Sequence, residues 1–339
     1  MLLISVIMSV WNGEKYLQQA VDSILNQSFK DFEFIVIDDA STDNTAEILR
    51  AYAEQDSRFR IFQNEQNLGL GENLARAVDL AKGEFVARMD TDDISMPERL
   101  KIQSDFLINQ PEILICGSDF EIIDADGFPK NKVSVIKNVN ILRWRLFLGS
   151  GTLVNHGTAM FRKSFFDKFG NYSPLRTAQD FELWSRLFEE QPLPMANLDH
   201  CLLKYRIHQE AITSLAKPEQ EEIAINTRLK TISELLGSEV QKEMLIAYRY
   251  PSLKYEDIGT HIEKWIEIYQ KFVDQFQPDE EAVKSIQLEM IERFNKYSLF
   301  PFQKKNPFRV SFYSILRKLP PSFRRLFIKE KLLWTLKRL

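Results

Sequence analysis

The sequence predicts an α/β fold, with a doubly wound, mostly parallel sheet, helices on both of its faces, and a helical C-terminal extension. Three observations predict this class. Apolar segments rich in β-branched residues alternate with segments of helical periodicity through residue 105. From residue 216 onward the segments are charged and helical in pattern. Acidic and aromatic residues follow the apolar segments directly, where parallel sheets bind their ligands.

The first part of the chain contains four expected strands and three expected helices in alternation. The first strand candidate is nearly all apolar, as a strand buried on both faces is, and the first helix candidate repeats apolar residues at helical spacing. The strands are expected at 4–10, 32–38, 59–64 and 84–90, and the helices at 13–27, 41–55 and 71–83. Ser41 or Asp43 fits the N-cap of the second helix, and Gly83 closes the third.

After Pro97 the alternation loosens, and the elements are expected to be mixed. The stretch "ILICGSDFEIID" (113–124) and the turn "DADGFP" (124–129) predict an antiparallel hairpin at the edge of the sheet. The remaining helices are expected at 99–111, 141–149, 180–190, 219–236, 238–249, 255–275 and 279–297. These segments suggest one large domain over 1–215, a helical extension over 216–302 and a separate tail over 303–339.

Composition indicates a soluble globular protein of a reducing compartment. The chain of 339 residues is 44% hydrophobic and 27% charged. Its two cysteines, Cys116 and Cys201, lie in apolar stretches without a partner at metal-binding or redox spacing, so we expect buried thiols. The N-terminus does not resemble a signal peptide, and no stretch is as long as a membrane span. A cytoplasmic location is therefore expected.

The tail over 303–339 differs from the rest in charge. It carries eleven Lys or Arg and one acid, a net charge of +10, whereas the remainder carries −14. Aromatic and aliphatic residues, including Trp334, alternate with these cations, which is typical of helices in an anionic membrane interface. Two other interpretations stay open: the apolar stripe packs on the protein itself, or the basic face binds nucleic acid, against which the acidic remainder argues.

Acidic residues at the strand ends predict a ligand site. Asp90 and Asp92 flank Thr91, and alternate residues of an extended chain share a face. Two such carboxylates near a phosphate suit Mg²⁺ or Mn²⁺, although an isolated D-x-D is more often a solvated turn. Asp39 ends the second strand, and Trp11 after the first can stack on a nucleobase. Together the strand ends predict a nucleoside-diphosphate pocket.

The segment "GLGENL" (69–74) is a weak competitor for this interpretation. It begins like the G-x-G-x-x-G of dinucleotide-binding proteins, but Leu74 stands where the third glycine belongs. The sequence therefore does not favour an oxidoreductase.

The stretches "SVIMSVWNGEKYLQQAVDSILNQSFKDFEFIVIDDASTDNT" and "NLGLGENLARAVDLAKGEFVARMDTDDISMPERL" closely resemble the family 2 glycosyltransferases, which have the GT-A fold. The resemblance is strong over residues 3–110 and moderate to 214. It implies an inverting, metal-dependent enzyme that moves one sugar from a nucleotide-diphosphate sugar, with UDP expected, to a glycan or lipid-linked acceptor in surface polysaccharide synthesis. The Q-x-x-R-W motif of processive members is absent. A glycan- or nucleotide-binding module without catalysis is the alternative.

The resemblance also implies roles for single residues. It divides the domain into a nucleotide-binding half (1–105) and an acceptor-binding half (106–215). Trp11 stacks on the base, Asp39 hydrogen-bonds it, Asp90 holds the ribose, and Asp92 holds the metal-bound diphosphate. The expected Mn²⁺ or Mg²⁺ ligands are Asp92 and Asp90. The implied contacts of the nucleotide sugar are Ser9, Trp11, Asp39, Arg88, Asp90, Thr91 and Asp93.

The general base implied by the resemblance is Asp180 in "TAQDFELWSRL". A carboxylate there can take the proton of the acceptor hydroxyl. Gln179 stands where the family usually has Glu, and a helix-capping charge is the other explanation for Asp180. His156, Arg162 and His208 are implied contacts of the acceptor or diphosphate, although a histidine of this kind is often a packing residue.

Overall fold

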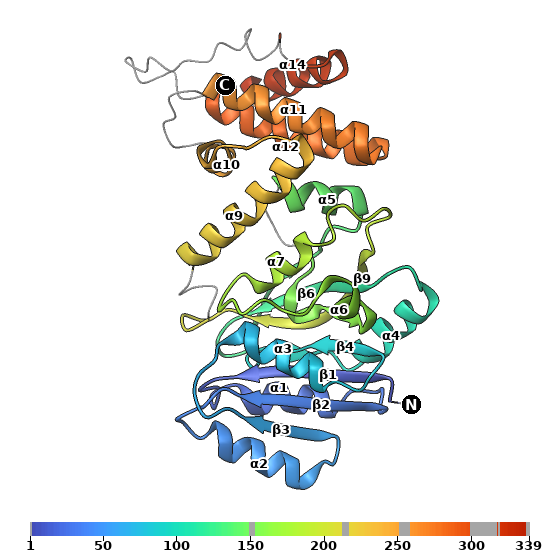
Figure 1. The fold of residues 1–339 in the computed structure, drawn as a ribbon, viewed down its shortest axis with the longest axis vertical. Coiled ribbons are helices and arrows are strands. Elements are labelled where there is room, and N and C mark those ends of the chain that lie inside the picture. Colours follow the sequence, from blue (N-terminus) through green and yellow to red (C-terminus); the bar gives the residue numbers. More distant parts are fainter. Residues whose placement is uncertain are drawn as a thin grey trace. The chain divides into compact units, whose positions relative to one another are not determined.

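The computed structural model describes residues 2–148, 153–211, 217–250, 258–298, 317 and 319–336 (Figure 1). The chain divides into two compact units. The sheet unit comprises Met1–Val139 and Thr152–Ala224, and the helical unit comprises Asn140–Gly151 and Ile225–Leu339. Helix α9 (Lys217–Leu236) runs across the boundary at residue 224.

Within the described residues, the sheet unit contains a nine-stranded mixed sheet in the order β3-β2-β1-β4-β8-β6-β9-β5, with β7 paired to β6. Its strands are β1 (Ile4–Val10), β2 (Phe32–Asp38), β3 (Phe59–Gln63), β4 (Phe85–Arg88), β5 (Ile94–Ser95), β6 (Ile115–Ile123), β7 (Pro129–Val133), β8 (Met160–Arg162) and β9 (Met195–Arg206). Strands β3, β2, β1 and β4 are parallel. The predicted GT-A-like α/β class is confirmed in this half, and the second half adds antiparallel pairs at β8, β7 and β5.

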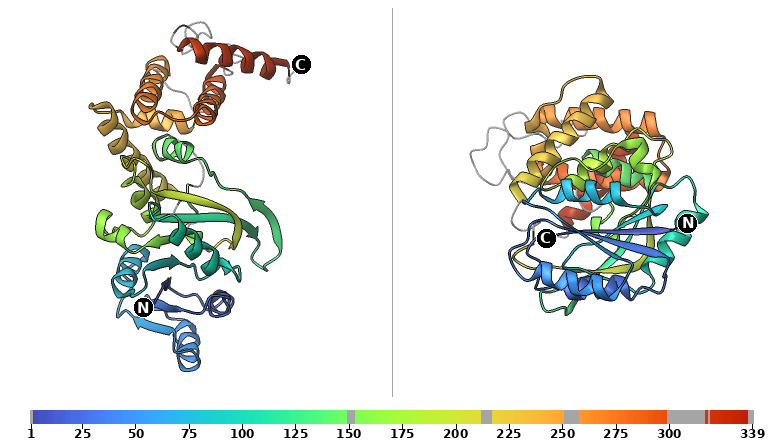
Figure 2. Two further views of the ribbon diagram at one scale, coloured as in Figure 1. Left: turned by 90° about the vertical axis from the view of Figure 1, so that its right-hand side faces the viewer. Right: turned by 60° about the horizontal axis from the view of Figure 1, so that its bottom comes forward.

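Helices cover both faces of the parallel half (Figure 2). The side chains of β1 alternate between the two faces of the sheet, so each face carries apolar residues that a helix can cover. Ile4, Val6, Met8 and Val10 join the core that α1 and α2 complete with residues such as Leu17 and Leu49. The odd-numbered side chains of β1 face the other way, where α3 contacts β1 and β2. These helices are α1 (Leu17–Leu25), α2 (Thr45–Gln55), α3 (Leu70–Leu80) and α4 (Arg99–Asn109).

Helix α1 begins four residues later than predicted, and the N-cap of α2 differs as well. The carbonyl of Gly13 accepts from the backbone N–H of Tyr16 and of Leu17, so residues 13–16 form a turn. Helix α2 follows Asn44, whose side chain makes no capping bond. Asp43 contributes from one position further back by accepting from the Thr45 N–H at 3.0 Å. Ser41 accepts from the Asn12 N–H instead.

The predicted hairpin is present as β6 and β7, but β6 lies inside the sheet because it also pairs with β8 and β9. Strand β9 was not predicted. Its register against β6 shifts around Asp119, so that Ser118 pairs with Leu198 but Asp119 pairs with Cys201. This irregularity interrupts the alternation by which a strand is recognised. The same strand leaves Cys201 partly exposed, whereas Cys116 is buried as expected.

The strand directions decide where the functional side chains gather. Strand β8 is antiparallel to both β4 and β6, and β9 is parallel to β6. Strands β1, β2, β4, β6 and β9 therefore all point the same way. Their carboxyl ends share one edge of the sheet, at which Trp11, Asp39, Asp90 and the residues after Arg206 are placed.

The rest of the sheet unit contributes η1 (His156–Thr158), α6 (Ser164–Phe169) and α7 (Gln179–Ser185). The helical unit has its own aromatic core. Trp144 packs edge-to-face on Phe272, with ring centroids 5.2 Å apart, and Trp265 stacks on Phe294 at 6.0 Å. Apart from α9, its described helices are α5 (Val139–Phe147), α10 (Lys242–Arg249), α11 (Ile258–Phe276), α12 (Glu280–Ser298) and α14 (Pro321–Leu336).

The basic tail over 303–339 is described only at 317 and 319–336, so the part at 303–316, 318 and 337–339 lies outside the described residues. Phe323 and Phe327 are fully buried. The Phe323 ring packs 5.5 Å from that of Tyr269 and 6.5 Å from that of Phe294. Here the apolar stripe packs on the protein's own helices. Across the described ranges, no helix has the length and apolar character needed to cross a membrane.

Removal of the Phe323 ring tests this packing. We expect Phe323→Ala to lower the free energy of unfolding of the helical unit by about 3–5 kcal/mol, because a large cavity replaces the ring. Ile328→Ala, on the exposed side of the same helix, should change it by less than about 0.5 kcal/mol. Urea unfolding followed by tryptophan fluorescence measures both. Equal midpoints for the two variants would show that α14 does not pack here.

Candidate active site

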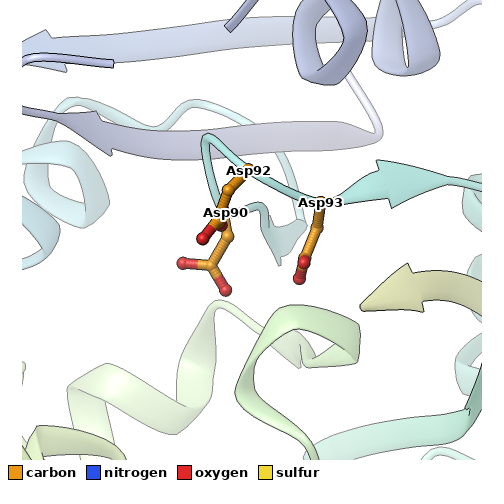
Figure 3. A group of neighbouring side chains, drawn as sticks. All are labelled: Asp90, Asp92 and Asp93. Atoms are coloured by element: carbon orange, nitrogen blue, oxygen red, sulfur yellow. The ribbon is translucent and has the colours of Figure 1, made fainter. Parts of the chain in front are cut away.

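Three carboxylates converge in the loop that follows β4 (Figure 3). Asp90, Asp92 and Asp93 each offer a carboxylate oxygen, and these oxygens all lie within 4.8 Å of one another. Hard oxygen ligands at this spacing suit Mg²⁺ or Mn²⁺. The predicted D-x-D pair is therefore part of a larger acidic group, which we call the acidic loop (residues 90–93).

Cationic and polar groups surround the acidic loop. The Arg88 guanidinium at the end of β4 donates to Asp90 Oδ2. His208 Nε2 lies 2.9 Å from Asp92 Oδ2, which places this predicted residue at the loop. The backbone N–H of Arg206 donates to Asp93 Oδ1 at 2.8 Å. Each carboxylate thus has its own neighbour from β4 or from the end of β9.

Asp93 is the most buried member of the loop, with 1% of its surface exposed. Burial and the nearby Asp92 charge raise the pKa of Asp93 to about 8, although the Arg206 N–H and the charges of Arg88 and Arg99 oppose this. Its Oδ2 is buried and makes no hydrogen bond. A buried carboxylate oxygen without a protein partner beside two further carboxylates fits a divalent cation.

Asp39 organises the loop after β3. Its carboxylate accepts from Asn64 Nδ2 at 2.8 Å and from the backbone N–H of Leu68 and Gly69 at 2.8 and 2.9 Å. Burial alone would raise the pKa of Asp39, but these hydrogen bonds outweigh it and hold the pKa below its usual value. Asp39 also joins the neighbouring strand end, because its N–H donates to the Val10 carbonyl.

The loops after β1, β2 and β4 contact one another. The Asn12 N–H donates to Ser41 Oγ at 3.0 Å, which ties the end of β1 to that of β2. A Cβ at Gly13 would lie 3.8 Å from the Cβ of Thr91, so the same loop lies against the acidic loop. Trp11 is 59% exposed at this edge, and Ser9 is partly exposed in β1. The predicted donor residues therefore gather in one place.

Asp180 occupies the first turn of α7. Desolvation raises the pKa of Asp180, opposed by backbone N–H groups and by the charge of Arg88. Burial lowers the pKa of Arg88, and the negative charges of Asp93, Asp180 and Asp92 oppose that change. Arg88 thus interacts electrostatically with the acidic loop and with the first turn of α7. The structure brings Asp180 into the same charge cluster as the D-x-D.

His156 and Tyr172 lie beside this cluster. His156 Nε2 and the Tyr172 hydroxyl are 2.9 Å apart, and the His156 ring packs against Trp184. Burial and the Arg88 charge lower the pKa of His156 well below its usual value, so the ring is neutral. His156 is thus in contact with two buried aromatic side chains, and its contact with the acceptor or diphosphate stays a prediction. Tyr172 interacts electrostatically with Arg88 and Asp180, and no motif pointed to it.

Arg162 does not join the candidate site. Strand β8 is antiparallel to β4, and Arg162 pairs with Phe85 at the amino end of β4. Its guanidinium donates to Glu84 at 3.0 Å and to the Leu107 carbonyl at 2.6 Å. The expected contact of Arg162 with the acceptor or diphosphate is therefore corrected: the side chain lies at the opposite edge of the sheet.

Comparisons with known proteins show that the chain is similar to glycosyltransferases. A family model described as "Glycosyl transferase family 2" matches residues 5–170. The putative glycosyltransferase EpsE of Bacillus subtilis is 34% identical over 213 residues, which are 61% of this chain and 74% of the relative. The O-antigen biosynthesis glycosyltransferase WbnJ of Escherichia coli is 34% identical over 211 residues, covering 62% and 81%.

Solved structures show the same fold. Staphylococcus aureus TarS 1–349 in complex with UDP-GlcNAc is 21% identical, with a TM-score of 0.57 over 87% of this chain and 88% of that one. The mannosyltransferase PcManGT of Pyrobaculum calidifontis, in complex with GDP-Man and Mn²⁺, is 15% identical, with a TM-score of 0.52 over 88% and 87%.

Because hydrogen bonds hold the pKa of Asp39 low, we expect the contribution of Asp39 to folding stability to depend on pH. Because the folded-state pKa lies below the unfolded value of about 3.9, ionised Asp39 stabilises the fold above that value, and this contribution is lost as the pH falls through the folded pKa. We expect Asp39→Asn to lower the free energy of unfolding by about 1–3 kcal/mol at pH 7. The difference from wild type should shrink below about pH 4.

Chemical denaturation at a series of pH values measures this difference. Asp31→Asn is the matched control, because Asp31 is exposed just before β2. It should change stability little at any pH. A difference between wild type and Asp39→Asn that is the same at pH 3 and pH 7 would contradict the prediction.

Proposed function

The chain belongs to the family 2 glycosyltransferases, and we propose that it transfers one sugar, with inversion, from a UDP-sugar to a hydroxyl group of a glycan or lipid-linked acceptor. The observation that carries the proposal is the gathering of the acidic loop, Asp39, Trp11 and Asp180 at one edge of the sheet. In this proposal residues 1–105 bind the nucleotide and 106–215 the acceptor.

We assign donor binding to the loops after β1, β2 and β4. The exposed indole of Trp11 offers a flat apolar surface for the base. Asp39 orders the neighbouring loop and accepts hydrogen bonds from the base, while Ser9 and Thr91 lie at the same edge. The UDP-GlcNAc complex of TarS supports a UDP donor, and the GDP-Man complex of PcManGT makes GDP-sugars the comparison to test.

The acidic loop would hold the metal ion. Asp92 and Asp90 are the assigned ligands, and Asp93 and His208 border them. When bound, Mn²⁺ or Mg²⁺ neutralises negative charge that develops on the leaving diphosphate. Arg88 brings a fixed positive charge to the same place from β4 and, with Asp93, flanks the donor sugar.

Asp180 acts as the general base. Its carboxylate accepts the proton of the acceptor hydroxyl, whose oxygen forms the new bond to the anomeric carbon of the sugar. The bond from that carbon to the diphosphate oxygen breaks on the opposite side, so the configuration inverts and the nucleoside diphosphate leaves. Desolvation raises the pKa of Asp180, which makes the carboxylate a stronger proton acceptor.

The O-antigen relative supports a role in surface polysaccharide synthesis. We therefore assign the enzyme to the cytoplasmic side of the membrane, where a lipid-linked acceptor would be presented, with residues 303–339 as the contact. The described part of the tail buries Phe323 and Phe327 but exposes Arg324 and Arg325. Contact would then be made by this basic face rather than by the buried apolar stripe.

Single substitutions separate the assigned roles. Asp180→Asn should lower kcat by about 10²–10⁴-fold, because the proton acceptor is lost, while donor and Mn²⁺ affinity stay close to wild type. Asp92→Asn should lose Mn²⁺ binding and transfer together. Glu182→Gln, in the same turn as Asp180 but paired with Arg186, is the matched control and should keep turnover. Nucleotide release across a panel of nucleotide sugars, with calorimetry for binding, measures these effects.

Full turnover by Asp180→Asn would remove the base assignment. Transfer that survives EDTA would remove the metal from the proposal. Donor binding without turnover, across all donors and acceptors, would instead favour the binding module without catalysis.

Vesicle binding tests the membrane contact. Arg325→Ala should weaken binding to phosphatidylglycerol vesicles about fivefold, since one basic residue near an anionic surface contributes about 1 kcal/mol. Arg50→Ala, which removes an exposed cation from α2, should leave binding unchanged. Equal sedimentation of the full chain with anionic and neutral vesicles would show that the tail is not a charge-dependent membrane contact.

A further inference from the structure

Arg206, the last residue of β9, is a buried cation whose donors reach three separate segments. Only 1% of its surface is exposed. Its Nε donates to the Asp92 carbonyl at 2.7 Å. One terminal nitrogen donates to the Ala125 carbonyl at 3.0 Å and the other to Gln19 Oε1 at 2.7 Å. The guanidinium also lies over the Tyr16 ring, 4.5 Å from its centroid. The acidic loop, the β6–β7 turn and α1 thus meet at one side chain.

The acceptors of this guanidinium are uncharged. They are two carbonyls of the β6–β7 turn, the carbonyl of Asp92 and the amide of Gln19. A planar guanidinium has its donors in a fixed fork, so several carbonyls bound to it are held at set positions. Arg206 therefore fixes the path of the backbone and leaves both Asp92 carboxylate oxygens to other partners.

The backbone around Arg206 strengthens this effect. Its own N–H donates to Asp93 Oδ1, so one residue holds both Asp92 and Asp93. His208, two positions further along the chain, lies 2.9 Å from Asp92 Oδ2. Asp92 is therefore held at its carbonyl by Arg206 and at its carboxylate by His208.

We propose that Arg206 is a positioning residue that preorganises the Asp92 carboxylate for a divalent cation, holds Asp93 beside it, and couples the acidic loop to the β6–β7 turn. The inference rests on the proposed metal-dependent function. Residues that orient metal ligands typically change metal affinity 10–100-fold when they are replaced. A residue with only a structural role would change the stability of the fold and leave metal affinity as it was.

Arg162 provides a matched control. It is also a largely buried arginine at the end of a strand, it donates to a backbone carbonyl, and it lies over an aromatic ring, that of Phe85, at 5.2 Å. It differs from Arg206 in position, since it lies at the opposite edge of the sheet. Loss of its guanidinium should reduce stability and leave the acidic loop undisturbed.

The test is Mn²⁺ binding to the full chain without nucleotide, followed by electron paramagnetic resonance. We expect the dissociation constant for Mn²⁺ to rise about 10–100-fold in Arg206→Met, and by a smaller factor in Arg206→Lys, which keeps the charge but not the fork. Arg162→Lys should stay within about twofold of wild type on the same argument. Thermal unfolding of each variant shows which of them are folded.

Hydrogen exchange measures whether Arg206 couples the acidic loop to the β6–β7 turn. In a folded Arg206 variant, the amides of 92–94 and of 124–128 should both exchange faster, because one side chain restrains both segments. Wild-type Mn²⁺ affinity in folded variants, with exchange unchanged in the acidic loop, would overturn the inference and leave the proposed function standing. Absence of Mn²⁺ binding in the wild type would overturn the metal assignment itself, and the inference with it.

Discussion

The candidate site depends on offsetting the mutual repulsion of crowded carboxylates. Two like charges about 4 Å apart repel by about 4 kcal/mol at the effective dielectric constant of a protein surface, and the acidic loop contains three carboxylates within 4.8 Å. Side chains next to the acidic loop in space offset this repulsion. Arg88 pairs with Asp90, His208 contacts Asp92, and burial together with the Asp92 charge raises the pKa of Asp93 to about 8, which favours its uncharged form.

These compensating groups come from both halves of the sheet. Arg88 ends the parallel strand β4, whereas Arg206 ends β9, more than a hundred residues later, and His208 follows it by two residues. Two consecutive antiparallel pairings, β4 with β8 and β8 with β6, restore the direction of β4 in β6 and β9. The mixed second half of the sheet thus places Arg206 and His208 at the same edge as the acids.

Local patterns explain how much of this could be predicted from the sequence. Strands β1 and β2 have the predicted bounds, because a continuous apolar run needs no distant partner to be recognised. The gathering of Trp11, Asp39 and Asp92 followed from one rule, that parallel strands end at a common edge. The contact expected of Arg162 came from the resemblance alone. Its place at the opposite edge depends on the three-residue strand β8 and on its antiparallel pairing with β4, which the sequence does not display.

Arg206 and Tyr172 could not be predicted as site residues from the sequence, for a related reason. Neither stands in a spacing that signals chemistry, and the meaning of each lies in partners far away along the chain. Arg206 bonds to Gln19, Asp92 and Ala125, and Tyr172 interacts electrostatically with Arg88. Motifs identify side chains that are suited to touch a ligand. The groups that hold those side chains in place act through backbone carbonyls, which every residue possesses, and they become visible only when the chain is folded.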